Sequence, residues 1–283
     1  MIARGAMMML VCCVLMAGCG TPLAGSDRAA DTPTLTPVAP PTDDPATRLV
    51  APGVTASGSV EAGTLADSHV STLSERSYRL RSEQTVSTSD GQLRERFLVD
   101  TTVRQPDRFL SRVETTGPSA PVILGRPPAS ASFWSNGTVY LREVSRDGET
   151  TYNDYDRASR AASWRYWART APFGGSGGSS RTFIADVFGS VQTTRVEDSG
   201  AASSIQLAGD RADGPLLGVA EPHNLTLEAT VSEEGYLVRL VLRFSGELGG
   251  ESVRVSRRVI YSEVGTARIE RPPWTGRALT GSG

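Results

Sequence analysis

Alternation of apolar and polar residues recurs along this chain and constrains its fold more than any other feature. In 225–231 and 237–244 every second residue is apolar, and 253–261 follows a similar pattern. A period of two is typical of a strand with one buried and one solvated face. Turn signals separate such segments, among them Ser89-Asp90-Gly91 and Glu233-Glu234-Gly235. The sequence therefore predicts a chain dominated by antiparallel strands.

Two segments interrupt the strand pattern with helical spacing. Residues 61–76 place Leu65, Val70 and Leu73 close to one face, and we expect His69 to be partly exposed on this helix. Residues 181–189 predict a second short helix. Together with about ten strands, these helices predict one domain over 59–283. Its expected fold class is mainly β with a few short helices (α+β). The expected form is a single curved antiparallel sheet or half-open β-barrel with helices on the concave side, and a closed barrel is the alternative.

The start of the chain has the composition of an export signal. All three cysteines and all five methionines lie within the first nineteen residues. Arg4 precedes an uncharged apolar run, residues 6–18, which is too short to span a bilayer core of about 30 Å. The run ends in Leu15-Met16-Ala17-Gly18-Cys19, which resembles the lipobox of prokaryotic lipoproteins. This resemblance predicts a lipoprotein signal peptide over 1–18 and a lipid on Cys19. An ordinary signal or membrane anchor with incidental cysteines is the alternative.

The residues that follow Cys19 lack the large apolar side chains that a core needs. They are rich in Thr, Pro, Ala, Ser, Gly and Asp up to about residue 58. Such a segment cannot bury enough surface to offset the entropy of ordering it. We therefore predict a disordered Thr/Pro-rich tether over 19–58, which attaches the domain to the membrane.

Composition also excludes several classes of function. No cysteine follows Cys19, so the body has no disulfide framework, no thiolate metal site and no cysteine nucleophile. The chain has only two histidines, which argues against a metal site. A net charge of −2 gives no global attraction to nucleic acid. The sequence also lacks nucleotide-binding loops and hydrolase or metalloprotease motifs. We therefore predict neither an enzyme nor a cofactor.

Apolar residues outside the strands are candidate ligand contacts. One group lies in 156–171 and could line a pocket for an apolar ligand, or pack a helix over the sheet. The other is an apolar triplet in the proline-bounded loop 118–128, which either fills the core or forms a mobile flap. The candidates are Trp164, Tyr166, Trp167, Val122, Ile123 and Leu124.

Two tripeptides match the N-glycosylation pattern, which an exported chain can use. Asn136-Gly137-Thr138 lies at a predicted hairpin turn, and Asn224-Leu225-Thr226 begins a predicted strand. We name Asn136 and Asn224 as candidate acceptors.

The order of these features resembles known lipoproteins. The blocks SYRLRSEQTVSTSDGQLRERFLVD, QPDRFLSRVE, FWSNGTVYLREVSRDGETTY and VIYSEVGTARIERPPW resemble uncharacterised lipoproteins of haloarchaea over about residues 50–280. More distantly, a helix followed by a long meander is similar to the LolA-like lipoprotein carriers of Gram-negative bacteria and the lipid-carrying lipoproteins of mycobacteria. That resemblance implies a half-open barrel whose concave face holds acyl chains.

Two functions follow as hypotheses. The first is a lipoprotein on the external face of the cytoplasmic membrane, anchored through Cys19, that binds or carries a lipid-like ligand. The second is a structural or protein-interaction domain at the cell surface, with a filled core and no ligand.

Overall fold

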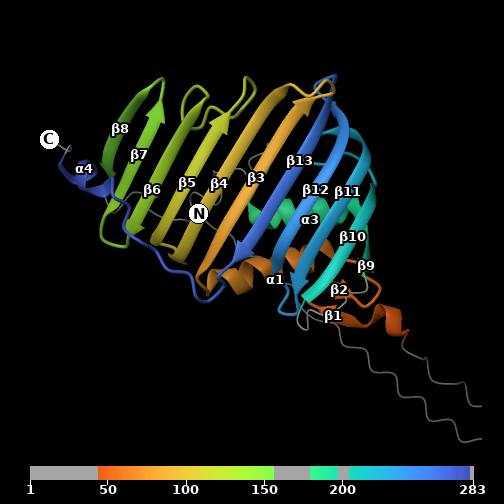
Figure 1. The fold of residues 1–283 in the computed structure, drawn as a ribbon. Helices are drawn as coiled ribbons and strands as arrows, with labels where there is room; N and C mark the ends of the chain where they lie inside the picture. Colours follow the sequence, from red (N-terminus) through yellow and green to blue (C-terminus); the bar gives the residue numbers. More distant parts are fainter. Residues whose placement is uncertain (1–43, 156–178, 197–203, 281–283) are drawn as a thin grey trace, which may run out of the picture. The chain divides into compact units, whose positions relative to one another are not determined.

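The computed structural model describes residues 44–155, 179–196 and 204–280, which belong to one compact unit. Eleven strands form a single antiparallel sheet in the order β8-β7-β6-β5-β4-β3-β13-β12-β11-β10-β9 (Figure 1). The sheet is curved (Figure 1). It is open because its two end strands, β8 and β9, do not pair with each other. The predicted fold class is therefore confirmed, and the chain does not close into a barrel. The strands are β3 Tyr78–Thr88, β4 Leu93–Gln105, β5 Arg108–Thr116, β6 Ala129–Asn136, β7 Tyr140–Arg146, β8 Glu149–Tyr155, β9 Val191–Val196, β10 Ser204–Ala212, β11 Ala220–Ser232, β12 Leu237–Leu248 and β13 Glu251–Ser262.

Two consecutive meanders build this sheet. One runs from β3 outward to β8, and the other runs from β9 inward to β13, so the first and last strands of the sheet pair at its centre. In that pair Gln84 lies opposite Arg257 and Leu80 lies opposite Tyr261. The central pairing therefore joins segments that are far apart in the sequence.

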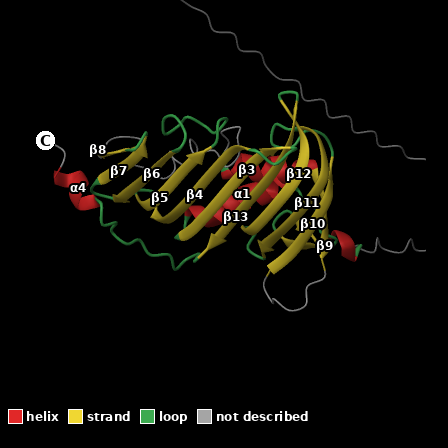
Figure 2. Cartoon of the chain, turned by 45° about the horizontal axis from the view of Figure 1, so that its top comes forward, coloured by secondary structure: helices red, strands yellow, loops and turns green. Residues whose placement is uncertain are grey.

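Helices α1 (Ala62–Ser74) and α3 (Ser180–Ser190) lie against the concave face of the sheet (Figure 2). The Glu61 carboxylate accepts the Thr64 N–H at 2.7 Å and caps α1, and the Ser179 hydroxyl accepts the Thr182 N–H at 3.3 Å and caps α3. Each helix buries one stripe of apolar side chains, which provides most of the stability of a short helix. The two predicted helices are confirmed, with ends one or two residues from those expected. Val70 is exposed rather than on the buried face of α1, because that face is formed by Leu65, Ala66, His69 and Leu73.

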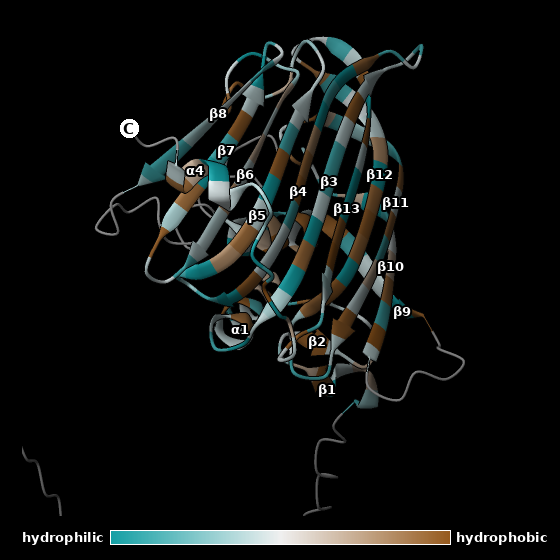
Figure 3. Cartoon of the chain, turned by 60° about the vertical axis from the view of Figure 1, so that its left-hand side comes forward, coloured by the Kyte–Doolittle hydropathy of each residue, from teal (hydrophilic) through white to brown (hydrophobic). Residues whose placement is uncertain are grey.

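Hydrophilic and hydrophobic residues alternate along the strands of the sheet (Figure 3). On the convex face, charged side chains pair across strands: Arg96 Nε lies 2.8 Å from Glu83, and Arg79 Nη2 lies 3.1 Å from Asp100. The inward-facing residues of the same strands are almost entirely buried. This pattern is expected of an antiparallel sheet with one covered and one solvated face.

The third helix, α4 (Thr275–Thr280), covers the convex face at the far end of the sheet. Trp274 and Ala278 form a small cluster there with Trp134 of β6 and Leu141 of β7. Neighbouring residues of those strands, Phe133 and Tyr140, belong to the main core on the concave face. One helix thus lies on the face opposite to the one predicted, because β6 and β7 carry apolar side chains on both faces.

The predicted tether is wrong for its last residues. Residues 44–58 belong to the compact unit and contain a small hairpin, β1 (Leu49–Ala51) with β2 (Val54–Thr55). Val54 is completely buried, and the Ser57 carbonyl accepts the Arg195 N–H of β9 at 2.9 Å. Gly58 is required at this contact, since a Cβ there would lie 1.9 Å from the Arg195 nitrogen. Docking on β9 satisfies part of an edge strand that would otherwise be exposed. Residues 1–43, with the predicted signal peptide, Cys19 and the rest of the predicted tether, lie outside the described residues.

Two further expectations differ from the structure. Strand β10 was not expected, because 204–212 ends in polar residues and alternates weakly, but it pairs with both β9 and β11. His69 is buried rather than partly exposed. Its Nδ1 accepts the Leu237 N–H of β12 at 3.1 Å, so the helix–sheet contact gives this polar side chain an internal partner.

Candidate functional site

The concave face is the candidate functional site, and its two halves differ. The covered half is the concave side of β3, β13, β12 and β11, which α1 and α3 cover (Figure 1). The outer half is the concave side of β5, β6, β7 and β8. Among the described residues, no helix lies behind the outer half in this view.

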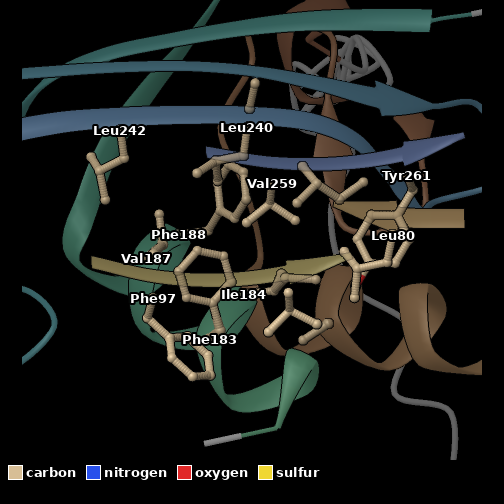
Figure 4. Packing of buried hydrophobic residues seen from close by; sticks show 14 of the residues in the cluster. Leu80, Phe97, Phe183, Ile184, Val187, Phe188, Leu240, Leu242, Val259 and Tyr261 are labelled. Atoms are coloured by element: carbon tan, nitrogen blue, oxygen red, sulfur yellow. The ribbon is translucent and has the colours of Figure 1, made fainter. Parts of the chain in front are cut away.

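The covered half is filled by side chains of α3. Phe183, Ile184, Val187 and Phe188 extend from the helix toward Leu240, Leu242 and Val259 of the sheet (Figure 4). All four α3 side chains are at least 96% buried. Burying an aliphatic or aromatic side chain of this size contributes roughly 1.5–3 kcal/mol. This half of the concave face is therefore a packed core.

A row of aromatic side chains crosses the outer half. The register places Phe109 of β5, Ser135 of β6, Tyr140 of β7 and Tyr155 of β8 side by side. The ring centroids of Phe109 and Tyr140 are 6.0 Å apart, and those of Tyr140 and Tyr155 are 5.1 Å apart. Phe109 and Tyr140 are buried, although no described helix lies over them.

The outer half also carries a cation. Arg142 of β7 lies in the next cross-strand row, beside Phe133 and Asn153. Its guanidinium carbon lies 5.0 Å from the centroid of the Tyr155 ring, and its Nη2 donates to Asn153 Oδ1 at 3.2 Å. Apolar rings next to a cation provide contacts for an amphiphilic ligand.

A second cation, Arg257 of β13, is buried in the covered half. Its Nη1 donates to Gln84 Oε1 at 3.2 Å, and the Gln84 amide donates to Glu95 Oε1 at 2.9 Å. The guanidinium carbon lies 5.2 Å from the centroid of the Phe183 ring. Burial lowers the pKa of Arg257 to about 9 and raises the pKa of Glu95, because each charge is held away from water. Hydrogen-bonded polar side chains, Arg257 and Gln84, are therefore buried within the apolar core.

His69 is the other buried titratable group of the covered half. Its ring packs edge-on against Tyr261, with centroids 4.8 Å apart. Burial lowers its pKa to about 3, so the imidazole is neutral near pH 7. A neutral imidazole that accepts a backbone hydrogen bond acts here as a structural contact between α1 and β12.

Several sequence-predicted residues are now placed. Leu124 is buried in the main core, whereas Val122 and Ile123 are exposed, so only one residue of the triplet fills the interior. Asn136 and Asn224 are exposed, and the Asn136 side chain accepts the Thr138 and Val139 N–H groups at its turn. Glycosylation of both stays a prediction. Trp164, Tyr166 and Trp167 lie outside the described residues.

Sequence reasoning missed Arg257 and Arg142. Both lie on strands where charged residues are frequent, and Arg257 and Arg258 are adjacent arginines. The signal that could have identified Arg257 is its position in the alternation, since it falls between Val255 and Val259 on the inward face.

Two depressions are lined by described residues. One of about 150 Å³ is on the convex side between Arg112, Glu143 and Trp274, and one of about 230 Å³ is near Gly189 and Gln192 at the β9 edge. In the described ranges, no group of three or more His, Cys, Asp or Glu side chains could hold a metal ion. None of the described helices is long and apolar enough to cross a bilayer.

Solved structures that resemble this chain do so weakly. LprF from Mycobacterium bovis aligns over 75% of this chain and 97% of its own, with 14% identity and a TM-score of 0.34. A LolA superfamily protein from Nitrosomonas europaea aligns over 75% and 96%, with 10% identity and a TM-score of 0.25. A putative outer membrane lipoprotein-sorting protein domain from Vibrio parahaemolyticus aligns over 75% and 94%, with 8% identity and a TM-score of 0.23.

Searches of protein families and of curated protein sequences find no match to this chain. The three solved structures include a LolA superfamily protein, the group named by the more distant resemblance. None of the three is haloarchaeal, so the resemblance to haloarchaeal lipoproteins stays a prediction. At these identities and TM-scores, the likeness assigns neither a family nor a function.

Proposed function

We propose that this protein is an exported lipoprotein that binds a lipid-like molecule on the concave face of its sheet. A lipid on Cys19 anchors it to the external face of the cytoplasmic membrane, and residues 20–43 form the tether. Its role is binding or carriage, not catalysis. Two acyl chains on the anchor make such attachment stable, whereas one chain is marginal.

The observation that carries the proposal is the aromatic row of the outer half. The rings of Phe109, Tyr140 and Tyr155 follow one another across β5, β7 and β8, with centroids 6.0 and 5.1 Å apart, and Phe109 and Tyr140 are buried. Apolar strips with a few polar groups at their margin are the usual lining of sites for small apolar molecules. Arg142 and Asn153 supply those polar groups.

Native mass spectrometry tests the binding role. The full-length protein is purified from membranes in a mild detergent and released from the micelle in the spectrometer. We expect the mass of the lipidated chain plus a noncovalently bound amphiphile, which organic extraction then identifies. Detection of the lipidated chain alone would show that no ligand is bound and would overturn the proposal.

Phase partitioning tests the anchor. We expect the protein to enter the detergent-rich phase of a cloud-point separation and Cys19→Ser to lose its lipid mass. Cys13→Ser is the matched control. It removes a thiol from the same leader, six residues before Cys19, and should leave the lipid in place. Equal masses for the Cys19 variant and the control would contradict lipidation at Cys19.

A second candidate is a surface domain for structure or protein interaction, with no ligand. The observation that favours it is the filled covered half, where Phe183, Ile184 and Phe188 occupy the space between α3 and the sheet. The two candidates differ in the native mass experiment, because only the first predicts a bound amphiphile.

A further inference from the structure

Arg257 is buried more completely than any other large polar side chain among the described residues. It has no exposed surface, and it lies on the inward face of β13 beneath Phe183 of α3. Its one hydrogen bond in the described structure joins Nη1 to the neutral amide oxygen of Gln84. The carboxylate of Glu95 is reached only through Gln84, so the cation has no direct anionic partner there.

Two donor groups of Arg257 are buried without a hydrogen-bond partner, Nε and Nη2. They share one edge of the planar guanidinium and point in nearly parallel directions. A buried donor without a partner destabilises a folded protein, and a buried charge does so more strongly. An unused pair of donors at this position therefore needs an explanation.

The same edge binds carboxylates elsewhere in this protein. Arg79 presents Nε and Nη2 to the two oxygens of Asp100 at 3.3 and 3.1 Å, and Arg181 presents Nε and Nη2 to those of Asp67 at 2.5 and 3.3 Å. This two-pronged geometry matches a carboxylate or a phosphate. In Arg257 the same edge is buried and unused.

We propose that the Nε–Nη2 edge of Arg257 binds the oxyanion headgroup, carboxylate or phosphate, of an acidic amphiphile whose tail lies along the concave face. This inference rests on the proposed function and specifies the class of ligand. The Phe183 ring lies over the guanidinium, 5.2 Å from its carbon, whereas the headgroup approaches the Nε–Nη2 edge in the plane of the guanidinium.

The test compares three probes that each have a linear chain of sixteen carbons: palmitic acid, methyl palmitate and hexadecyl phosphate. They are mixed in equal amounts with the full-length protein in a neutral detergent, and native mass spectrometry measures the occupancy of each. We expect an acidic probe to exceed the neutral ester by about tenfold or more, the factor that charge-assisted hydrogen bonds supply. The more strongly bound acidic probe identifies the headgroup as carboxylate or phosphate. Equal occupancy by all three probes would overturn the inference.

Variants locate the preference. Arg257→Met should bind acid and ester equally, and Arg257→Lys should keep only part of the preference because a lysine lacks the two-pronged edge. Arg258→Met is the matched control, since Arg258 is the next residue of β13 and is exposed. It should behave as the unmodified protein. A preference that survives in Arg257→Met, or one abolished only by Arg142→Met, would contradict the role of Arg257.

The outcomes separate the two proposals. If the unmodified protein binds none of the probes and carries no amphiphile of its own, the proposed function is wrong, and the inference about Arg257 falls with it. If the protein binds ester and acids equally, the proposed function stands and only the inference about Arg257 is wrong. Both outcomes are measured on the unmodified protein, so the two proposals can be separated even if Arg257→Met does not fold.

Discussion

The two ends of the sheet differ in the number of faces that they bury. Toward the β9 end, helices α1 and α3 cover the concave face of β3, β13, β12 and β11 (Figure 1), and charged side chains lie on the convex face. Toward the β8 end, α4 and Trp274 cover the convex face of β6 and β7, and the concave face of these strands is also buried. A strand buried on both faces loses the alternation that a half-buried strand keeps. The paired residues Phe133-Trp134 and Tyr140-Leu141 are the signature of that change.

The two ends of the sheet also differ in how much they contribute to the stability of the folded unit. The covered half belongs to the main core, whereas the α4 cluster has four buried members among the described residues. A loss in the main core should lower the stability of the whole unit, while a loss in a small satellite cluster should open the structure locally. Substitutions at the two ends can therefore test the comparison.

The largest effect is expected at Leu65, a completely buried residue of α1. Leu65→Ala leaves a cavity between α1 and the sheet, and we expect a loss of about 3–5 kcal/mol in the free energy of unfolding. Urea unfolding followed by circular dichroism measures it. Val70→Ala on the same helix is the control, since Val70 is exposed, and should change little. Equal losses for both variants would show that α1 is not packed as described.

A smaller effect is expected at the other end. Trp274→Ala should remove about 2 kcal/mol, less than a tryptophan in a closed core, because α4 can detach while the rest stays folded. Hydrogen exchange should then increase in β7 and β8 and stay unchanged in α1 and α3. Leu279→Ala, at an exposed position of α4, is the control. Faster exchange in α1 after Trp274→Ala would contradict the independence of the two ends.

The buried imidazole makes the covered half sensitive to pH. The pKa of His69 is about 3 in the folded protein and 6.5 in a solvated histidine. The unfolded chain therefore binds more protons between these values, so stability is lost as the pH falls below about 6.5. We expect a loss of up to about 1.4 kcal/mol per pH unit between pH 6 and 5.

His69→Asn should remove this contribution, because asparagine keeps an acceptor for the Leu237 N–H and does not titrate. Urea unfolding at pH 7, 6 and 5 measures the slope for each variant. His223→Asn is the control at an exposed position. If His69→Asn keeps the slope of the unmodified protein, other groups cause the pH dependence.

The smallest effect is expected where α1 and α3 meet at the surface. Arg181 Nε lies 2.5 Å from Asp67, and both side chains are more than half exposed. Solvent screens such a pair, so the double variant Asp67→Asn with Arg181→Gln should leave the urea midpoint unchanged. A shift comparable with that of Leu65→Ala would mean that the helix pair depends on this contact instead of on its buried stripes.

Much of the fold could be predicted from the sequence, because its signals are local. The alternation in 237–244 and the capped apolar stripe of 62–74 need no distant partner to be recognised. Strand β10 and the β1–β2 hairpin were not recognised, because their residues alternate weakly or are rich in proline and threonine. Those segments are held by pairing and docking on neighbours that the sequence does not identify.

The sequence by itself determined that this chain forms antiparallel strands with two covering helices, since side-chain periodicity reports which residues must leave water. Only the tertiary structure decided that β3 pairs with β13, that α4 covers the convex face, and that Arg257 lies beneath Phe183. The physical reason is distance along the chain. The contacts of Arg257 with Gln84, and of His69 with Leu237, join residues more than 160 positions apart. No local pattern specifies such pairs, yet they set the chemistry of the concave face.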